Sequence, residues 1–363
     1  MKAMTEPTGR SGVGFLSVIG RIEMPVSAVA ETGLVYVSDS EPGITRRRAG
    51  RGFSYLMPDG SRIERKTERA RIDALGIPPA YDGVWICTRR NGHIQATGKD
   101  ERERKQYRYH PDWSEWRARQ KFDQQREFAD ALPRIRRRVR ADLGGDPGEL
   151  DYTLAALAFL LEYAPMRVGN REYALENGTF GATTLLNRHV ELDGDTVRMD
   201  YRAKGGKRVR RTMHHKRLHR VLESIADLPG KELFVWRNRD GDFVPVDSSR
   251  LNTYLAEISG LETVTAKTFR TWAGTLTAFR EAISTIEAGE TPTVKALSEA
   301  AAEELQNTPV ISRTSYIHPA VIDLAKDEDD TRRHLTRALE KPATRKGLLA
   351  DEQRLTAFLD LTG

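Results

Sequence analysis

Residues Met166 to Leu185 have the sequence Met-Arg-Val-Gly-Asn-Arg-Glu-Tyr-Ala-Leu-Glu-Asn-Gly-Thr-Phe-Gly-Ala-Thr-Thr-Leu. The apolar run Leu150 to Tyr163 precedes it, and the leucines of that run recur at the spacing of one helix face. Arg167 follows Pro165 at the end of this predicted helix, a natural place for a guanidinium directed out of the core. Because the planar fork of a guanidinium can bind two phosphate oxygens at once, the segment predicts an anion-binding arginine.

Downstream of this segment, two β-like runs interrupt a mostly helical sequence. Thr196 to Ala203 and Lys207 to Met213 are joined by Gly205-Gly206, a strong hairpin signal because both turn positions accept a positive φ. Lys204 is expected at the hairpin tip, either as a solubilising surface lysine or as a flexible ammonium that reaches a reacting group. The sequence predicts this hairpin as an island among helices.

The C-terminal third of the chain is predicted to be helical. The expected segments are Thr265 to Ile283 with Thr265 as N-cap, Pro292 to Leu305, a stretch around Ser312, and Asp330 to the end. Lys267 and Arg270 lie three residues apart and share a helix face, either as a solvated basic stripe or as a paired cationic site. Tyr316, taken alone, is typical of a packed aromatic residue whose hydroxyl is satisfied.

The N-terminal third has the pattern of strands and turns. The strand-like runs are Leu34 to Val37, Phe53 to Leu56, Val84 to Cys87 and His93 to Ala96. The turn sequences Pro58-Asp-Gly60 and Asn91-Gly92 indicate hairpins. The period changes to helical near residue 115, so we expect a loose extension over 1–30, a β-rich domain over 31–115 and an α-rich domain over 116–363. The predicted fold class is α+β.

The charge of the chain is concentrated in two windows. The whole chain has 363 residues, a net charge of +6 and a pI near 9.3. Lys99 to Arg140 contains 14 basic and 8 acidic residues, and Arg198 to Arg220 contains 10 basic residues and one acidic residue. Each window alone is compatible with a solvated face, but two separated basic blocks, the first containing several aromatic residues, favour a surface that binds phosphates.

Composition also excludes several classes of protein. The longest strongly apolar run, Leu154 to Leu161, is far shorter than the roughly 20 residues of a membrane span, and the first 30 residues lack the apolar core of a secretory signal. Cys87 is the single cysteine, which forbids an intrachain disulfide and indicates a reducing cytoplasm. The sequence contains no Gly-x-x-x-x-Gly-Lys loop, no His-Glu-x-x-His motif and no acidic cluster with two-metal spacing, so we expect no cofactor and no metal.

Several blocks of sequence together suggest a family. Besides residues 166–185, they are Gly92 to Gly98, Arg104 to Tyr109, Ala203 to Lys207, Lys267 to Gly274 and Asn307 to His318. In this order they resemble the type IB DNA topoisomerases, in the compact form found in bacteria and poxviruses. The likeness extends from about Leu34 to His318, and neither the first thirty residues nor the tail beyond about 325 matches a motif.

The resemblance implies roles for individual side chains. Tyr316 is the implied nucleophile, whose attack on a DNA phosphate leaves a 3′-phosphotyrosyl bond and a free 5′-hydroxyl. Arg167 and Arg270 form the implied transition-state clamp, with Lys267 assisting, and Lys204 is the implied general acid. A lysine suits that role because, unlike arginine, it can give up its proton.

The sequence departs from many family members at Asn307, where poxviral and eukaryotic members commonly have histidine. Asparagine can donate a hydrogen bond to a nonbridging phosphate oxygen but cannot supply a proton. We therefore expect Asn307 to be an oxyanion donor and not an acid.

The resemblance also implies DNA contacts outside the catalytic group. The implied residues are Arg104, Gln106, Tyr107, Tyr109, Arg117 and Lys207. On a strand, the period of two places Tyr107 and Tyr109 on one face, which lies either along DNA or in the core.

The function implied by the resemblance is relaxation of supercoils through a reversible nick in one strand, without ATP or an obligatory metal. The implied architecture is a C-shaped clamp in which a small β-rich domain and a larger α-rich domain of the tyrosine recombinase and type IB topoisomerase fold enclose duplex DNA. A monomer in the bacterial cytoplasm, at the nucleoid, is expected, with no membrane partner.

Two alternatives remain open at this point. A tyrosine recombinase shares the arginine, lysine and tyrosine chemistry, although recombinases usually have histidine at the position of Lys267 and a helical N-terminal domain. A DNA-binding protein that has lost catalysis is the other, and the intact set of candidate residues speaks against it.

Overall fold

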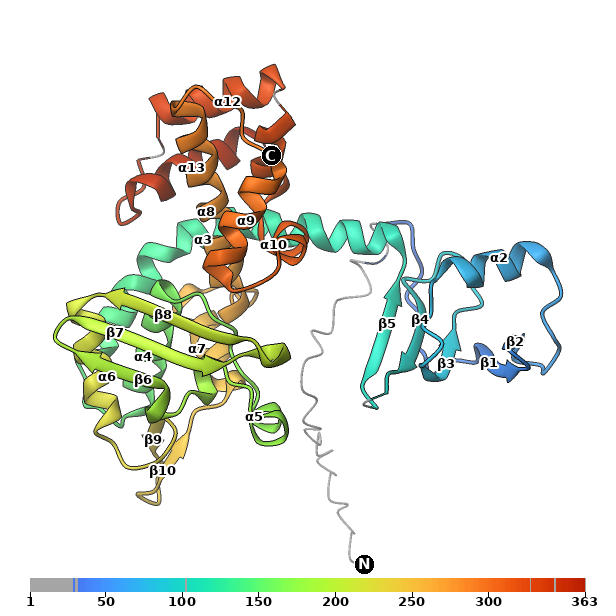
Figure 1. Cartoon of the computed structure of the whole chain (residues 1–363), viewed down its shortest axis with the longest axis horizontal. Helices are drawn as coiled ribbons and strands as arrows, with labels where there is room; N and C mark the ends of the chain where they lie inside the picture. The colour runs from blue at the N-terminus through green and yellow to red at the C-terminus, as the bar shows by residue number, and fades with distance from the viewer. Residues whose placement is uncertain (1–28, 30–31, 102, 327, 343, 363) are drawn as a thin grey trace, which may run out of the picture. The chain divides into compact units, whose positions relative to one another are not determined.

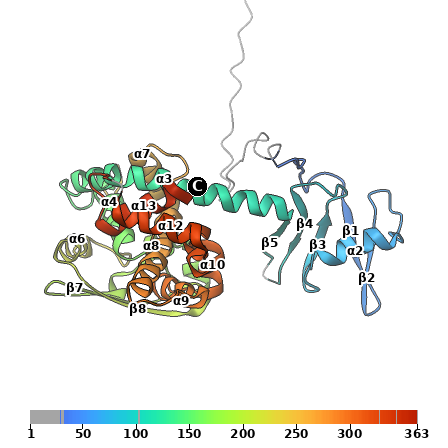
Figure 2. The same cartoon turned by 90° about the horizontal axis from the view of Figure 1, so that it is seen from above.

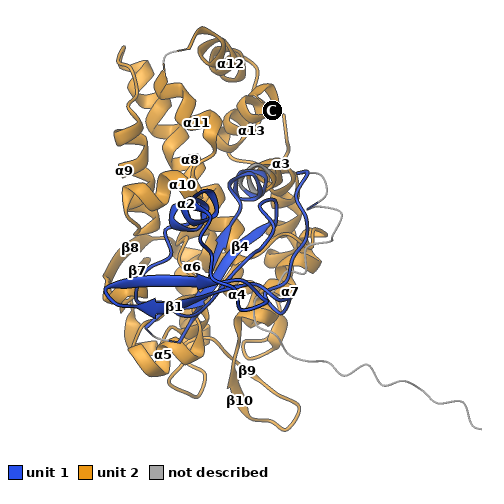
Figure 3. Cartoon of the chain, turned by 90° about the vertical axis from the view of Figure 1, so that its right-hand side faces the viewer, with its two compact units in different colours: residues 1–119 blue, residues 120–363 orange. Residues whose placement is uncertain are grey.

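The computed structural model describes residues 29, 32–101, 103–326, 328–342 and 344–362. The chain divides into two compact units, unit 1 with residues 1–119 and unit 2 with residues 120–363 (Figure 3). The expected extension over 1–30 lies outside the described residues, apart from the buried Val29. The expected domain change near residue 115 falls within α3, a single helix that runs from Pro111 to Asp142.

Unit 1 contains one antiparallel sheet of five strands in the order β2-β1-β3-β4-β5 (Figure 1). The strands are β1 (Ile44–Ala49), β2 (Gly52–Leu56), β3 (Asp82–Ile86), β4 (Ile94–Lys99) and β5 (Lys105–Tyr109). Helix α2 (Lys66–Ala74) follows β2 and buries Ile72 in the core of the sheet. Because β5 is an edge strand, one side of it is not paired within the sheet.

Two details of unit 1 differ from the expectation. The run Leu34 to Val37 is not a strand, since it makes a single parallel bridge from Val35 to Gly92. Leu34 and Val37 are buried without a continuous ladder, and Tyr36 is exposed. The structure also adds β1 and α2, whose basic and polar sequences carry little apolar periodicity.

Unit 2 is mostly helical. After α3 its helices are α4 (Leu150–Tyr163), α5 (Arg171–Asn177), α6 (Lys216–Ala226), α7 (Ser248–Ser259), α8 (Ala266–Glu287), α9 (Val294–Leu305), α10 (Pro309–Tyr316), α11 (Pro319–Asp323), α12 (Asp329–Glu340) and α13 (Ala350–Thr362). Helices α8, α9 and α10 pack against one another, and α12 packs against α13 (Figures 1 and 2). The helix expected from Asp330 to the end is therefore two helices, separated by the residues around Pro342.

A three-stranded antiparallel sheet in unit 2 carries the predicted hairpin. Its strands are β6 (Val190–Asp193), β7 (Thr196–Arg202) and β8 (Arg208–His214), in that order. Gly205 and Gly206 have φ values of 80° and 76°, which confirms the glycine turn between β7 and β8. The hairpin is not an island, because β6 pairs with β7 and a second small sheet joins β9 (Val235–Arg237) to β10 (Phe243–Pro245).

The core of unit 2 lies between α4, α8 and the sheet. The leucine face of α4 is fully buried, as its sequence predicts, and Thr265 directly precedes α8 as its N-cap. No helix within the described residues combines the length and the apolar character of a membrane span.

Candidate active site

Arg167 is fixed by a short pairing between the end of α4 and the second half of the segment quoted first. The amide of Ala182 donates to the carbonyl of Arg167 at 2.8 Å. A Cβ at Gly181 would lie 2.5 Å from that carbonyl oxygen, so a side chain there would force the two segments apart. Gly181 allows the close approach that holds the backbone of Arg167. The half-buried side chain of Arg167 extends to Asn307.

Arg270 lies on α8 and is almost fully buried, with 3% of its surface exposed. Its guanidinium donates to the carbonyl of Pro165, to the carbonyl of Leu305 at 3.0 Å and to Oδ1 of Asn307 at 3.3 Å. Burial lowers the pKa of Arg270, and the nearby Arg167 lowers it further, whereas Tyr316 raises it. These carbonyl and amide oxygens are neutral, so they orient the charge without cancelling it.

Asn307 joins the two arginines. Helix α9 ends at Leu305, and Gln306 then adopts a left-handed conformation with φ of 53°, which turns the chain before Asn307. Oδ1 of Asn307 accepts from Nη2 of Arg167 at 2.5 Å and from Nη2 of Arg270. Its Nδ2 is buried and has no hydrogen-bond partner among the described residues. Since a buried donor without a partner is costly, this amide is suited to an oxygen that arrives with a ligand.

Tyr316 is the last residue of α10 and is half-buried beside α8. The guanidinium carbon of Arg270 lies 5.1 Å from the centre of its ring. Thr275 holds the backbone, because its Oγ1 donates to the carbonyl of Tyr316 at 3.1 Å and accepts from the amide of His318 at 3.0 Å. A Cβ at Gly274 would lie 2.9 Å from the same carbonyl oxygen, so α10 approaches α8 where only glycine fits.

The structure therefore brings four of the six predicted catalytic residues together. Arg167, Arg270 and Asn307 are hydrogen-bonded in one network, and Tyr316 lies against Arg270. The hydrogen bonds of this network, within the described residues, include neither Lys204 nor Lys267. Lys267 is exposed although it lies only three residues before the buried Arg270.

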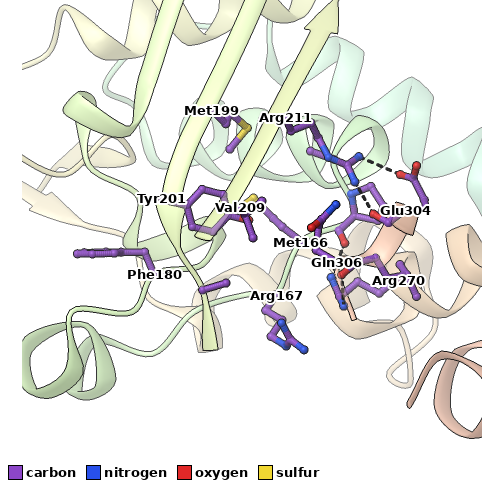
Figure 4. A pocket seen from close by; sticks show the side chains of 14 residues that line it. Met166, Arg167, Phe180, Met199, Tyr201, Val209, Arg211, Arg270, Glu304 and Gln306 are labelled. Carbon is purple, nitrogen blue, oxygen red and sulfur yellow. Dashed lines mark hydrogen bonds and ion pairs between the residues drawn. The ribbon is translucent and has the colours of Figure 1, made fainter. Parts of the chain in front are cut away.

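Lys204 directly follows a residue that lies beside the network. Arg167 and Arg270 line a cavity of about 20 Å³, and Ala203, which precedes Lys204, lines the same cavity (Figure 4). This volume holds about one water molecule, so a nucleotide has to bind at the surface beside it. Lys204 is exposed in the hairpin turn, as expected, and so is Lys207.

The predicted DNA contacts of unit 1 lie on and near β5. Arg104 pairs with Asp100 at 2.7 Å, and the side-chain amide of Gln106 donates to the same carboxylate at 2.9 Å. The rings of Tyr107 and Tyr109 stack at 5.9 Å with an angle of 10°. Neither tyrosine is part of the buried core, so the alternative of core residues is wrong.

Arg117 belongs to the same surface. Its guanidinium carbon lies 5.7 Å from the ring centre of Tyr109. Lys105 lies 5.5 Å from the ring of Tyr107 and also pairs with Asp39. The two stacked rings thus have a cation at each end, Lys105 from β5 and Arg117 from α3, which is a pattern suited to a sugar-phosphate backbone.

The sequence did not predict the residues that bind the backbone segments next to the site. Thr275 directly follows the quoted block that ends at Gly274, so its position was a signal. Arg211 and Glu304 form an ion pair at 2.9 Å between β8 and α9. No local pattern could reveal this pair, since its members are 93 residues apart.

The comparisons with known proteins agree with this geometry. Residues 110–338 match the family model for the catalytic core of eukaryotic DNA topoisomerase I. The chain belongs to the type IB DNA topoisomerases. Residues 52–100 also match the model for the N-terminal domain of bacterial DNA topoisomerase IB. A DNA topoisomerase 1B of Acanthamoeba polyphaga mimivirus is 27% identical over 300 residues, which cover 79% of this chain and 89% of that relative.

This family membership confirms the predicted class of enzyme, a DNA topoisomerase of type IB. It favours the topoisomerase over the recombinase, the alternative that the sequence left open. All six predicted catalytic residues lie within the matched range 110–338. Within the described residues, no group of three histidine, cysteine, aspartate or glutamate side chains is placed to bind a metal ion.

Proposed function

We propose that this type IB topoisomerase cleaves DNA through Tyr316, with Arg167, Arg270 and Asn307 as the phosphate clamp and Lys204 as the general acid. The observation that carries the proposal is the amide of Asn307. Its oxygen is bound by both arginines, while its Nδ2 is buried without a partner among the described residues. This arrangement supports a site prepared for a nonbridging phosphate oxygen.

The charge around that amide supports the same assignment. Neither Arg167 nor Arg270 forms an ion pair with a carboxylate in the described part of the chain. Their positive charges are therefore available to the phosphorus centre, which gains negative charge in the transition state. The low exposure of Arg270 strengthens its interaction, because little water screens it.

The chemical step exchanges one ester for another. The phenol of Tyr316 gives up its proton to solvent water, and its oxygen bonds to phosphorus while the bond from phosphorus to the 5′ oxygen breaks. Lys204 donates a proton to that leaving oxygen from the mobile end of a long side chain. The bond energy is kept in the phosphotyrosyl ester, so resealing after strand rotation needs no ATP.

We propose in addition that unit 1 supplies the second face of a C-shaped clamp, with Arg104, Gln106, Tyr107, Tyr109 and Arg117 along the DNA and Lys207 on the face of unit 2. The stacked rings of Tyr107 and Tyr109, with a cation at each end, support this role. If these contacts neutralise phosphates, each R→Q change lowers the slope of log affinity against log salt by about 1.

A monomer bound to duplex DNA at the nucleoid, in a bacterial cytoplasm, completes the proposal. Light scattering of the enzyme with and without a short duplex tests the monomer, since a dimer doubles the mass. A fluorescent fusion that does not follow the DNA in cells contradicts the location.

The central experiment is relaxation of supercoiled plasmid in EDTA without ATP. We expect a ladder of relaxed topoisomers with the unaltered enzyme and none with Y316F, which lacks only the attacking oxygen. Denaturation during the reaction traps protein on the 3′ side of the nick. Unchanged supercoiling at high enzyme excess contradicts the proposal, and so does a covalent adduct that still forms in Y316F.

A further inference from the structure

Arg211 differs from the other arginines on its strand. Arg208 and Arg210 point to the outer face of β8 and pair with Asp200 across the hairpin. Arg211 is one residue further along, so its side chain lies on the opposite face. That side chain is only 18% exposed, and it lines the cavity that Arg167 and Arg270 also line (Figure 4).

The guanidinium of Arg211 binds two separate segments. It donates to the carboxylate of Glu304 at 2.9 Å and to the carbonyl oxygen of Glu304. It also donates to the carbonyl of Tyr163, the last residue of α4, at 3.4 Å. Figure 4 shows the side chain directed at Glu304 from the strand.

Arg270 binds the same two segments one or two residues further on. It donates to the carbonyls of Pro165 and Leu305. The two guanidinium groups therefore form two cross-links between the end of α4 and the end of α9. The last carbonyls of a helix have no partner within it, and cations there are also favoured by the helix dipole. Both arginines thus stabilise the end of α9 from which Asn307 emerges.

We infer that Arg211 is a positioning residue for the cleavage step: from β8 it holds the end of α9, and so places Asn307 between Arg167 and Arg270. The inference rests on the proposed function of those three residues. Arg211 does not touch the phosphate in this role. Arg211 fixes Glu304, which is three residues before Asn307. Without the guanidinium of Arg211, the amide of Asn307 can move away from the position where Arg167 and Arg270 both bind it.

The test compares variants that remove the same charge from the two faces of one strand. R211Q and R210Q each lose one positive charge on β8, and R211K keeps the charge but loses the planar fork. For each we propose to measure the relaxation rate of supercoiled plasmid at saturating plasmid, the plasmid concentration for half-maximal rate, and the melting temperature. Denaturing quench gives the fraction of molecules that form the covalent adduct.

We expect R211Q to lower the saturating rate at least tenfold relative to R210Q, while the half-maximal plasmid concentration of the two agrees within threefold. R211K remains impaired, because an ammonium cannot bind both segments in the same way. A purely structural role would lower the melting temperature and the active fraction, but each active molecule would keep its rate. Equal saturating rates for R211Q and R210Q overturn the inference.

E304Q keeps the test valid if R211Q does not fold. It removes the carboxylate but leaves the carbonyl of Glu304 to Arg211, so we expect a smaller loss of rate, between threefold and tenfold. A rate equal to that of the unaltered enzyme then overturns the inference. Failure of the proposed function is distinguishable, because in that case the unaltered enzyme itself forms no adduct.

Discussion

Arg104, which directly precedes β5 in unit 1, and Arg270, which lies beside Asn307 in unit 2, are held by different kinds of partner. Arg104 lies at the surface and pairs with the carboxylate of Asp100. Arg270 is buried and is held by carbonyl and amide oxygens. A carboxylate largely cancels the charge that it orients, whereas a neutral oxygen orients the charge and leaves it available. Partner type, more than the number of basic residues, therefore distinguishes the surface that we propose to follow DNA from the site that we propose to react with it.

The largest expected effect comes from Arg270. R270K keeps the charge on α8 but cannot reach the two carbonyls and Asn307 together. We expect the saturating relaxation rate to fall roughly 10³-fold, the upper end of the loss for a removed oxyanion donor. Plasmid relaxation over a range of enzyme concentrations measures it. R104K is the matched change in unit 1, and an equal loss in both variants would break the comparison.

Asn307 tests the importance of a neutral acceptor directly. N307D keeps the shape and still accepts from Arg167 and Arg270, but it adds a negative charge and removes the donor Nδ2. We expect a loss of about 10²-fold or more in the rate of adduct formation, and a larger loss than in N307A. If N307D is more active than N307A, then the neutral side chain of Asn307 does not serve to keep the positive charges of Arg167 and Arg270 available.

Gly274 tests how closely α10 must approach α8. In G274A the new Cβ lies within 3 Å of the carbonyl of Tyr316, of its Cβ and of the side chain of Leu305. We expect a loss of about 1 to 3 kcal/mol in unfolding free energy, with slower cleavage because Tyr316 moves away from Arg270. Urea unfolding and adduct formation measure the two effects. A273G, one residue earlier on α8, is the control for altered helix propensity, and an unchanged G274A would contradict the packing argument.

Asp100 tests, in unit 1, whether a carboxylate partner reduces the charge that Arg104 offers to DNA. D100N removes the charge that pairs with Arg104 and keeps the shape of the side chain. We expect DNA affinity to rise a few-fold, and the salt slope to steepen by about 1, because one more cation is free to displace a counterion. Filter binding of a duplex at several salt concentrations measures both. Affinity that falls, or a slope that does not change, would show that Asp100 only positions Arg104.

The smallest expected effect is a pH dependence in unit 1. Burial lowers the pKa of His93, whose ring stacks on Tyr36 and accepts a hydrogen bond from the amide of Val37. The unfolded chain therefore takes up a proton near pH 6.5 more readily than the folded chain. Stability from this group is present above that pH and is lost as the pH falls below it.

Hydrogen exchange of the amides in β4, in the full chain, measures the effect of His93. We expect faster exchange at pH 5.5 than at pH 7.5, after correction for the intrinsic rate. H93Q, which cannot be protonated in this range, is expected to lose the pH dependence. Equal pH dependence in the two proteins would assign the effect to another group.

Elements with a strong period were predictable from the sequence. The leucine face of α4 and the glycine turn after Lys204 were confirmed, with strand ends within a residue of the prediction. Helix α2 was missed because its sequence, Lys-Thr-Glu-Arg-Ala-Arg-Ile-Asp-Ala, buries little more than Ile72. The strand predicted over Leu34 to Val37 was wrong, since Leu34 and Val37 are buried by packing and the run makes only one bridge, at Val35, among the described residues.

The sequence predicted the residues of the candidate site but not the contacts that position them. Motifs identify Arg167, Arg270 and Asn307 by type and order, whereas their shared hydrogen bonds depend on segments 140 residues apart. The contacts that position these side chains are made to backbone carbonyls, which every residue has. A carbonyl oxygen leaves no trace in the sequence, so the role of Arg211 becomes visible only in three dimensions.

The double use of Arg270 has a practical consequence for making an inactive enzyme that still grips its substrate. Its guanidinium links the ends of two helices, so its removal would weaken that packing as well as the phosphate clamp that we propose. The hydroxyl of Tyr316 lies at the end of its side chain, beyond the backbone groups that Thr275 holds. An inactive variant for mapping where this enzyme binds DNA is best made by removing that one oxygen atom.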